Sequence, residues 1–362
     1  GGVPTLLLET GATDRVATYV AGSGSNTLAF SYTVQSGDST PDLDYASSTA
    51  LVLNGAVVQD AAGTNAILTL PAPGGANSIA GQRALVIDGV APTVTSVAVP
   101  ADATYVAGQS LDFTVTWSEA VTVDITNGTP RLAVLLDAGG PAEAAYVAGS
   151  GSSALVFRMT VQAGQQDGTG LSLGALVETN GSTVRDAAGN SATSTLNGVA
   201  STAGVRVDAR GPVMTALAGP ANGTYGRGQA LEFTVTWPEP VIVDTTSGTP
   251  GLVVSLDHGP SLTAAYVATT PDGRTMLFRG EVVAGQADGT GVVVSALTAP
   301  AGSMLDPAGN PASLTLSNVS NLLGVLVDGD APGLVIGAPS LSSTTRGPVT
   351  FAVTYVDAST VT

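Results

Sequence analysis

Residues 111–117 read Leu-Asp-Phe-Thr-Val-Thr-Trp, a stretch in which apolar and polar residues alternate strictly. This period of two predicts a β-strand with one buried face, because successive side chains of a strand point to opposite sides. A similar stretch returns at residues 231–237, so that Trp117 recurs as Trp237 after 120 residues, and again at 349–355. A chain that repeats at this period is predicted to be an array of equivalent folding units.

A second alternating stretch, at residues 28–34, recurs at 155–161. Its third copy has Gly280 on the inward side, between Phe278 and Val282, and we expect a bulge or a gap there. Turn signals follow roughly every eight to twelve residues, and no stretch has the 3.6-residue periodicity of a helix. The sequence therefore predicts an all-β chain of tandem antiparallel β-sandwiches with a period of about 120 residues and essentially no helix.

The repeat also predicts where the units begin and end. Asp88, Asp208 and Asp328 close three successive segments at the same spacing. The predicted units are a partial one that lacks its first two strands, two complete ones, and the first two strands of a further one: residues 1–90, 91–210, 211–330 and 331–362. Two interpretations of the end fragments stay open: a window of a longer repetitive protein, or a tail that completes the head of a neighbouring molecule.

The composition limits the candidate functions. The net charge is -17, which disfavours nucleic acid and anionic lipid surfaces as partners and favours cations. The chain has no cysteine, and all 11 of its basic residues are arginine, so neither disulfides nor lysine isopeptide bonds stabilise it. Only 11% of the residues are charged, yet no apolar run reaches membrane-spanning length, so membrane insertion is not expected. Acidic repeats rich in Gly, Thr and Asp suggest an extracellular location.

Four short stretches carry a resemblance to a known family. They are the strand and linker at residues 88–94, the strand end at 117–121, the stretch at 146–151 and the Asp-Ala-Ala-Gly-Asn turn at 186–190. Together they resemble the bacterial Ig-like repeats of large secreted adhesins and biofilm-associated surface proteins. The resemblance covers nearly the whole chain. It implies Ig-like β-sandwiches on the bacterial cell surface that act as a stalk, with calcium stiffening the joints in several relatives.

The repeated acidic residues are the candidate metal ligands. An antiparallel topology is expected to bring carboxylates together at each boundary between units. The expected groups are Asp60, Asp88 and Glu119, then Asp186, Asp208 and Glu239, and then Asp306, Asp328 and Asp357 with Asp330 added. Carboxylate oxygens in such number suit calcium, which takes six to eight oxygen ligands. The alternative is that these are ordinary residues of strand ends, with Asp186 and Asn190 accepting N–H groups of their turn and Gly189 in a left-handed conformation.

Other residues that could carry chemistry are given structural interpretations. The acidic stretch at 38–44 lacks the glycine and the closing glutamate of a calcium loop and is interpreted as a polar surface loop. His258 is the only histidine and is expected to lie in an exposed turn rather than in a catalytic triad. Trp117 and Trp237 continue the inward face of their strands and are expected to fill the core rather than stack on sugars. No enzyme activity is predicted.

The sequence thus predicts a non-enzymatic extracellular stalk whose modules each add roughly 30–40 Å, given strands of about ten residues. The expected partners are neighbouring modules or subunits of the same protein, with any contact to cell-surface or matrix components made by regions outside this chain. One alternative is a self-assembling filament or surface-layer subunit in which residues 331–362 complete residues 1–90 of a neighbour. A third class, glycan or ice binding, requires a flat exposed array of threonine or aromatic side chains.

Overall fold

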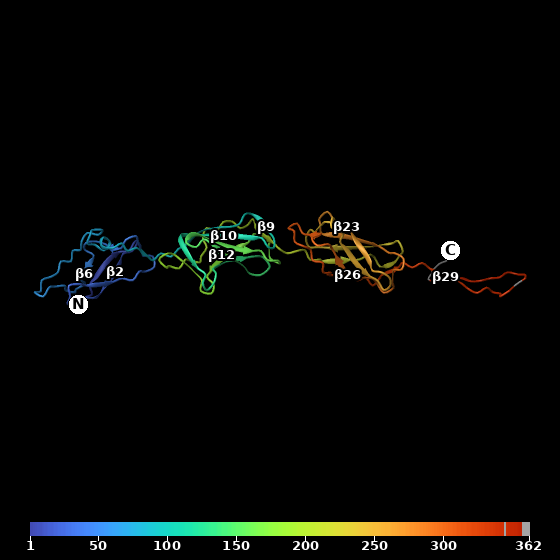
Figure 1. Ribbon diagram of the computed structural model, residues 1–362, viewed down its shortest axis with the longest axis horizontal. Coiled ribbons are helices and arrows are strands. Elements are labelled where there is room, and N and C mark those ends of the chain that lie inside the picture. The colour runs from blue at the N-terminus through green and yellow to red at the C-terminus, as the bar shows by residue number, and fades with distance from the viewer. Residues whose placement is uncertain (344, 357–362) are drawn as a thin grey trace. The chain divides into compact units, whose positions relative to one another are not determined.

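The computed structural model describes residues 1–343 and 345–356. In these residues the protein is nearly all β: thirty strands and one four-residue helix, α1 (Ile79–Gln82) (Figure 1). The expectation of an all-β chain with essentially no helix is therefore confirmed. The chain divides into two compact units, one formed by residues 1–161 and 167–207, the other by residues 162–166 and 208–362.

Residues 91–208 contain two sheets. The first is largely antiparallel, in the order β15-β11-β12-β13-β10-β16 with β8 also on β10, and the second has the order β14-β17-β9. Their bounds are β8 (Val94–Ala98), β9 (Ala103–Tyr105), β10 (Ser110–Asp124), β11 (Arg131–Leu135), β12 (Ala142–Ala148), β13 (Ser152–Thr160), β14 (Gln166–Asp167), β15 (Ser172–Val177), β16 (Thr183–Arg185) and β17 (Val205–Asp208).

Residues 211–330 repeat this arrangement. The order is β18-β20-β24-β23-β22-β26 in one sheet, β19-β28-β25 in another, and β21 paired with β27. Their bounds are β18 (Ala216–Ala218), β19 (Gly223–Gly226), β20 (Ala230–Thr236), β21 (Ile242–Val243), β22 (Gly251–Ser255), β23 (Leu262–Thr269), β24 (Thr275–Glu281), β25 (Ala287–Asp288), β26 (Val293–Thr298), β27 (Met304–Leu305) and β28 (Val325–Asp328). Phe233 of the first sheet and Val325 of the second belong to one buried cluster.

The end segments contain fewer strands. In residues 1–90 the sheet order is β3-β2-β1-β5, with β6 also on β1 and β4 paired with β7, and near the end of the described residues β29 pairs with β30. Their bounds are β1 (Thr5–Glu9), β2 (Arg15–Ala21), β3 (Ala29–Ser31), β4 (Ser39–Thr40), β5 (Asp44–Tyr45), β6 (Leu51–Val52), β7 (Ile87–Asp88), β29 (Gly333–Ile336) and β30 (Val353–Val356).

The alternating stretch at 111–117 forms the central part of β10. Its apolar side chains are almost completely buried, with Phe113 opposite Phe157 on β13, and Phe233 opposite Phe278 in the next copy. Trp117 and Trp237 are 2% and 1% exposed, which confirms that they fill the core. The indole nitrogens of both are buried without a hydrogen-bond partner among the described residues.

The bulge expected at Gly280 is not present. β24 keeps a continuous register along β20, with Gly280 directly opposite Leu231. A Cβ atom on Gly280 would lie 2.3 Å from Cδ2 of Leu262, so the side chain of Leu262 occupies the space that the glycine leaves. In the previous copy the corresponding positions are Ala142 and Met159, both buried. The two copies thus fill the same part of the core with a large residue on opposite strands.

The segment that leads into the last strand of each repeat runs parallel to its first strands. Val97 of β8 forms a parallel bridge with Val199, and β9 pairs in parallel with β17. The next copy has the same parallel contacts, between β18 and Val319 and between β19 and β28. Residues 190–208 therefore run in the same direction as residues 92–105. The sequence interpretation had assumed instead that the segment after the Asp186 turn runs antiparallel to the last strand, β17.

Candidate metal centre

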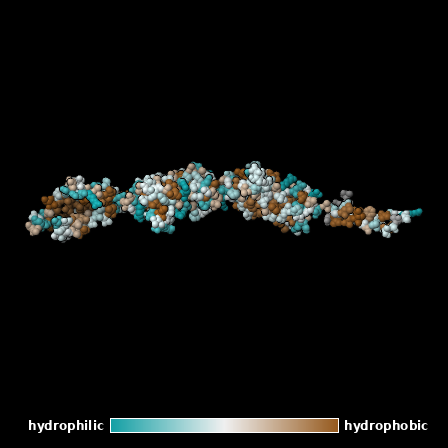
Figure 2. Space-filling model, viewed as in Figure 1, coloured by the Kyte–Doolittle hydropathy of each residue, from teal (hydrophilic) through white to brown (hydrophobic). Residues whose placement is uncertain are grey.

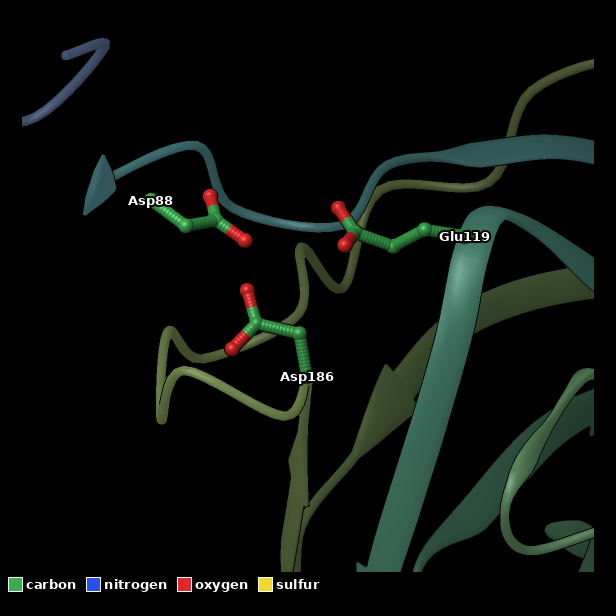
Figure 3. A group of neighbouring side chains, drawn as sticks. All are labelled: Asp88, Glu119 and Asp186. Carbon is green, nitrogen blue, oxygen red and sulfur yellow. The ribbon is translucent and has the colours of Figure 1, made fainter. Parts of the chain in front are cut away.

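Two groups of three carboxylates recur at the same positions of the repeat. Asp88, Glu119 and Asp186 form the first cluster, and in each cluster one oxygen of every carboxylate lies within 4.8 Å of the others. Figure 3 shows the three side chains of the first cluster directed toward a common space from three separate segments of the chain. The second cluster consists of Asp208, Glu239 and Asp306.

The strands explain why distant acids meet in the first cluster. Asp88 is the last residue of β7 and begins the first linker, residues 88–92. β10 pairs with β13 as far as Thr116, shifts register, pairs with β13 again at Val121, and then pairs through residues 122–124 with β16. Glu119 lies in that shifted stretch, and Asp186 directly follows β16. The bulge of β10 therefore brings Glu119 and Asp186 to the same end of their sheet, where Asp88 enters.

An asparagine holds each turn acid against the linker. Asn190 donates from its backbone N–H to Oδ1 of Asp186 at 2.8 Å, and from Nδ2 to Oδ2 of Asp186 at 2.8 Å and to the backbone oxygen of Asp88 at 3.0 Å. Gly189 has φ 96°, which confirms the expected left-handed conformation. Asp186 is buried and accepts the turn N–H as expected, but the amide of Asn190 acts as a donor.

The second cluster has the same bridge. Asn310 donates from its backbone N–H to Oδ1 of Asp306 at 2.8 Å, from Nδ2 to Oδ2 of Asp306 at 2.9 Å, and to the backbone oxygen of Asp208 at 3.0 Å. Asp208 begins the second linker, residues 208–212. The sequence interpretation did not assign this bridging role, although the Asn that follows Gly at 120-residue spacing was a visible signal for it.

Burial and the repulsion of neighbouring acids raise the pKa of the glutamate in each cluster. Burial raises the pKa of the Glu119 carboxyl, and the nearby charges of Asp88 and Asp186 raise it further. Burial likewise raises the pKa of Glu239, with Asp208 and Asp306 adding to it. The clusters differ in the charges near the glutamate, because Arg274 and Arg210 offset part of the rise in the pKa of Glu239.

The observed groups correct the predicted ones. Asp186 joins Asp88 and Glu119, not Asp208, and Asp306 joins Asp208 and Glu239, not Asp328. The reason is the parallel course of residues 190–208, which leaves the Asp186 turn at the end of the unit where the first strand begins. The prediction had placed that turn at the opposite end of the unit, beside Asp208 instead of Asp88.

The remaining predicted ligands lie elsewhere. Asp60 is exposed and its Oδ1 accepts the N–H groups of Ala62 and Thr64, so its own turn uses it. Asp328 accepts the N–H of Asp330 at 3.3 Å, and neither belongs to an acidic group among the described residues. Asp357 lies outside the described residues. Whether any of these acids binds a metal stays a prediction.

The acidic stretch at 38–44 is not a surface loop, which corrects the sequence interpretation. Asp38 is 1% exposed and accepts hydrogen bonds from Arg15 at 2.8 Å, from the Tyr32 hydroxyl and from the N–H of Gln35. The Tyr32 bond holds the pKa of Asp38 below its usual range. Burial, together with the neighbouring Asp38, raises the pKa of Tyr32 to about 12.

Asp44 in the same stretch is also buried. Its carboxylate accepts N–H groups of Tyr45, Gly74 and Ile79, which ties the start of α1 to β5. These carboxylates are occupied by protein donors and stabilise the fold of residues 1–90. His258 is exposed in its turn, as expected, and its backbone pairs with Ala287.

The chemistry of the two clusters fits a hard divalent cation. Each cluster offers three carboxylates, and calcium takes oxygen ligands in flexible geometry. Asn190 uses one acceptor direction on each oxygen of Asp186, through its backbone N–H on Oδ1 and its side-chain amide on Oδ2, and a carboxylate oxygen has a second. A cation here would also cancel the repulsion that raises the pKa of Glu119.

Comparison with known proteins adds no relative. Scanned against protein-family models, the chain matches none, and a search of curated proteins finds no match. Within residues 1–343 and 345–356, no helix combines the length and the apolar character that crossing a bilayer requires. The functional proposal therefore depends on the repeated fold and the two acidic clusters.

Proposed function

We propose that this chain is a non-enzymatic structural segment of an extracellular bacterial surface protein, formed by tandem Ig-like β-sandwich modules. Its action is mechanical, because each module adds length and each linker sets how far neighbouring modules can bend. Calcium bound at the acidic clusters restrains the linkers. The resemblance of the linker, strand and turn motifs to Ig-like repeats of surface adhesins supports this reading, as does the acidic, cysteine-free composition.

The sheets support the Ig-like part of the proposal. Residues 211–330 combine a six-stranded and a three-stranded sheet whose inward residues share one buried cluster, as two packed sheets do. The strands are short and mostly antiparallel, and the same order returns in residues 91–208. Units of this size and strand content are typical of Ig-like sandwiches.

The observation that carries the proposal is the repetition of the clusters with their bridges. In both, the three carboxylates come from the last strand of one repeat, from the next repeat and from its Asp turn; Glu119 lies in the shifted stretch of β10 and Glu239 between β20 and β21. In both, an asparagine binds the turn acid and the linker carbonyl together. A site that depends on the junction of two repeats, and recurs at the junctions that begin at Asp88 and Asp208, is suited to controlling the junction itself.

Calcium would be held in the first cluster by Asp88, Glu119 and Asp186. It supplies positive charge that offsets the repulsion among the three acids and connects the linker to the body of the next repeat. Asp88 belongs to the linker, whereas Glu119 and Asp186 belong to the following sheets, so a shared ion opposes their separation. The carboxylates of the second cluster act in the same way.

The test is to measure unfolding temperature and small-angle X-ray scattering of the whole chain in calcium and in a chelator. The proposal predicts a higher unfolding temperature in calcium and a narrower distribution of molecular dimensions, because bending at the linkers is restrained. Magnesium at the same concentration is the control, since it demands stricter octahedral geometry and releases its water reluctantly. Identical unfolding and scattering in calcium and in chelator would contradict the proposal.

A further inference from the structure

We propose that each of the two complete repeats, residues 91–208 and 211–330, resists tension along the chain through one element: the parallel pairing of its first segment with its last. A pulled repeat can extend only after this pairing has broken. The role goes beyond setting length and bending at the linkers, and it does not depend on calcium.

In residues 91–208 the pairing extends from the entering linker to the leaving one. It begins where the N–H of Thr193 donates to the oxygen of Pro92 at 2.8 Å, and it continues at Val97, which lies opposite Val199. It ends where β9 pairs in parallel with β17. Pro92 closes the first linker, and β17 ends at Asp208, which begins the second. Tension from either linker therefore enters the repeat at this pairing.

The direction of the two segments decides how the pairing is strained. The first segment is pulled at its start and the last segment at its end, and both run in the same direction. Tension therefore slides them past each other, so the hydrogen bonds between them are strained together. If the segments were antiparallel, both would be pulled at the same end and their bonds would open one at a time. Bonds that must break together slow unfolding, and forced unfolding is governed by that rate.

The core shields the pairing from water on one side. Val97 of β8 is buried, as are Val205 and Val207 of β17. Figure 2 shows hydrophilic and hydrophobic residues mixed over the visible face of the two complete repeats, whereas the buried side chains beside the pairing are uniformly apolar. Water that competes for backbone groups during pulling is thereby excluded from this side.

Residues 211–330 have the same pairing. The N–H of Ser313 donates to the oxygen of Pro212 at 2.8 Å, Leu217 lies opposite Val319, and β19 pairs in parallel with β28. β28 ends at Asp328, so this pairing also extends to the last strand of its repeat. The two repeats thus join their first and last segments at equivalent places.

The second repeat adds two bonds between the same segments. Nδ2 of Asn318 donates to the backbone oxygen of Thr215 at 2.8 Å, and the N–H of Gly219 donates to Oγ of Ser320 at 3.0 Å. The preceding repeat has residues without these polar groups at the two positions: Gly198 and Ala200. Residues 211–330 should therefore withstand the higher tension.

The extra bonds can be removed without changing the backbone. Asn318 has φ 47° and Gly198 has φ 60°, so both adopt the left-handed conformation that glycine tolerates without strain. The double variant Asn318→Gly, Ser320→Ala reproduces the residues of the preceding repeat. It should lower the rupture force of residues 211–330 to that of residues 91–208.

Single-molecule stretching of the whole chain, held by tags at its two ends in a chelator, measures these forces. Each complete repeat should extend in one step of up to about 430 Å, since its roughly 120 residues span at most about 3.6 Å each. The unmodified chain should show two such steps at unequal forces. In the double variant the two forces should become equal.

A disulfide across the pairing assigns the steps. Thr104 and Arg206 lie directly opposite each other and are exposed, and the chain has no cysteine of its own. Oxidised Thr104→Cys, Arg206→Cys keeps the residues between the two cysteines from extending, because directly opposite residues lie within disulfide reach. The step at the lower force should shorten to about 60 Å, the length of the few residues outside the loop, and return on reduction.

Two proline variants test the bonds themselves. Ala103 donates its N–H to the oxygen of Gly204 at 3.0 Å, whereas the N–H of the next residue, Thr104, faces the other side of β9, which is an edge of its sheet. Ala103→Pro should lower the rupture force of residues 91–208 by roughly a quarter, because it removes a bond of the pairing. Thr104→Pro should leave the force nearly unchanged, since an edge tolerates proline there.

Three results would each overturn the proposal: equal forces for the two repeats of the unmodified chain, unequal forces in the double variant, or equal losses in the two proline variants. Circular dichroism verifies that each variant is folded. If Ala103→Pro does not fold, the double variant decides alone, because its new residues already stand at the same positions of the preceding repeat. All forces are measured in chelator, so these results leave the calcium proposal untouched.

Discussion

At the scale of single residues, one place in the core is filled differently in successive repeats. Residues 91–208 use Ala142 and Met159, whereas residues 211–330 use Leu262 and Gly280 on the equivalent strands. The Cβ position of Gly280 is 2.3 Å from the Leu262 side chain, so the two choices exclude each other. The two residues together therefore fill this part of the core, and the size of one limits the size of the other, as is typical of close-packed interiors.

This pair predicts a strong coupling in unfolding experiments. Leu262→Ala should cost about 2–4 kcal/mol through the cavity it leaves, and Gly280→Met should also destabilise because Met would overlap Leu262. The double variant, which reproduces the pair of the preceding repeat, should recover most of the loss. Denaturant unfolding of the four proteins gives the coupling energy. Additive losses in the double variant would show that the two side chains do not share this space.

The buried carboxylate of Asp38 makes a second prediction. Arg15→Met removes its charged partner and should destabilise residues 1–90 by about 3–5 kcal/mol, because a buried charge is left unpaired. Tyr32→Phe removes one donor and should cost only about 1–2 kcal/mol. Both tryptophans lie outside this segment, so backbone hydrogen exchange is the suitable measurement. Equal effects of the two variants would mean that the ion pair contributes no more than the hydroxyl.

The same carboxylate sets the response of this segment to acid. The pKa of Asp38 is lowered in the fold by its bond from Tyr32, so its stabilising contribution is complete above the unfolded pKa and disappears as the pH falls through the folded pKa. Acid should therefore lower the protection factors of backbone amides in residues 1–90, once the intrinsic pH dependence of exchange is taken into account. In Arg15→Met this loss of protection should be smaller, because part of the contribution is already lost.

At the scale of strands and turns, Glu119 gives the opposite pH response. Its folded pKa is raised, so without calcium its charge destabilises the fold at neutral pH, and protonation relieves that cost as the pH falls through the folded pKa. In chelator, Glu119→Gln should therefore raise the unfolding temperature at neutral pH and weaken the gain on acidification. Glu143→Gln, at an exposed carboxylate, is the control. A lower unfolding temperature for Glu119→Gln in chelator would contradict this account.

Sequence alone predicted the strands well and their partners poorly. The alternation at residues 111–117 was sufficient to predict a strand, because burial of one face makes every second residue apolar. The Asp186 turn was placed at the wrong boundary because its position depends on which way residues 190–208 run, and only pairing with β8 and β9 decides that. Similarly, Gly280 alone suggested a gap, since the residue that fills it, Leu262, lies on another strand.

The acidic candidates show the same limit. A carboxylate in a polar stretch looks similar whether it is exposed, as Asp60 is, or buried and bonded to backbone N–H groups, as Asp44 is. Two of the three residues that donate to Asp44, Gly74 and Ile79, are 30 and 35 residues away in the chain. The repeat had already identified the acids of both clusters as candidates. Which acids lie together could be determined only from the fold.

At the scale of the whole molecule, the clusters should not be equivalent. The pKa of Glu239 is raised, but Arg274 and Arg210 offset part of the rise, whereas every cause acting on Glu119 raises its pKa. Positive charge that favours the ionised carboxylate also repels a cation. We expect the first cluster to bind calcium more tightly than the second, and Arg274→Gln to strengthen binding at the second. Equal affinities would mean that these arginines are screened by solvent.

Calorimetric titration of the whole chain with calcium tests the central claim most directly, because it counts ions. The account predicts that Glu119→Gln and Glu239→Gln each remove one bound calcium from the number measured for the unmodified chain, and that the double variant removes two. Asp60→Asn should leave the number unchanged. An unmodified chain that binds no calcium, or variants that bind as many ions as it does, would contradict the account.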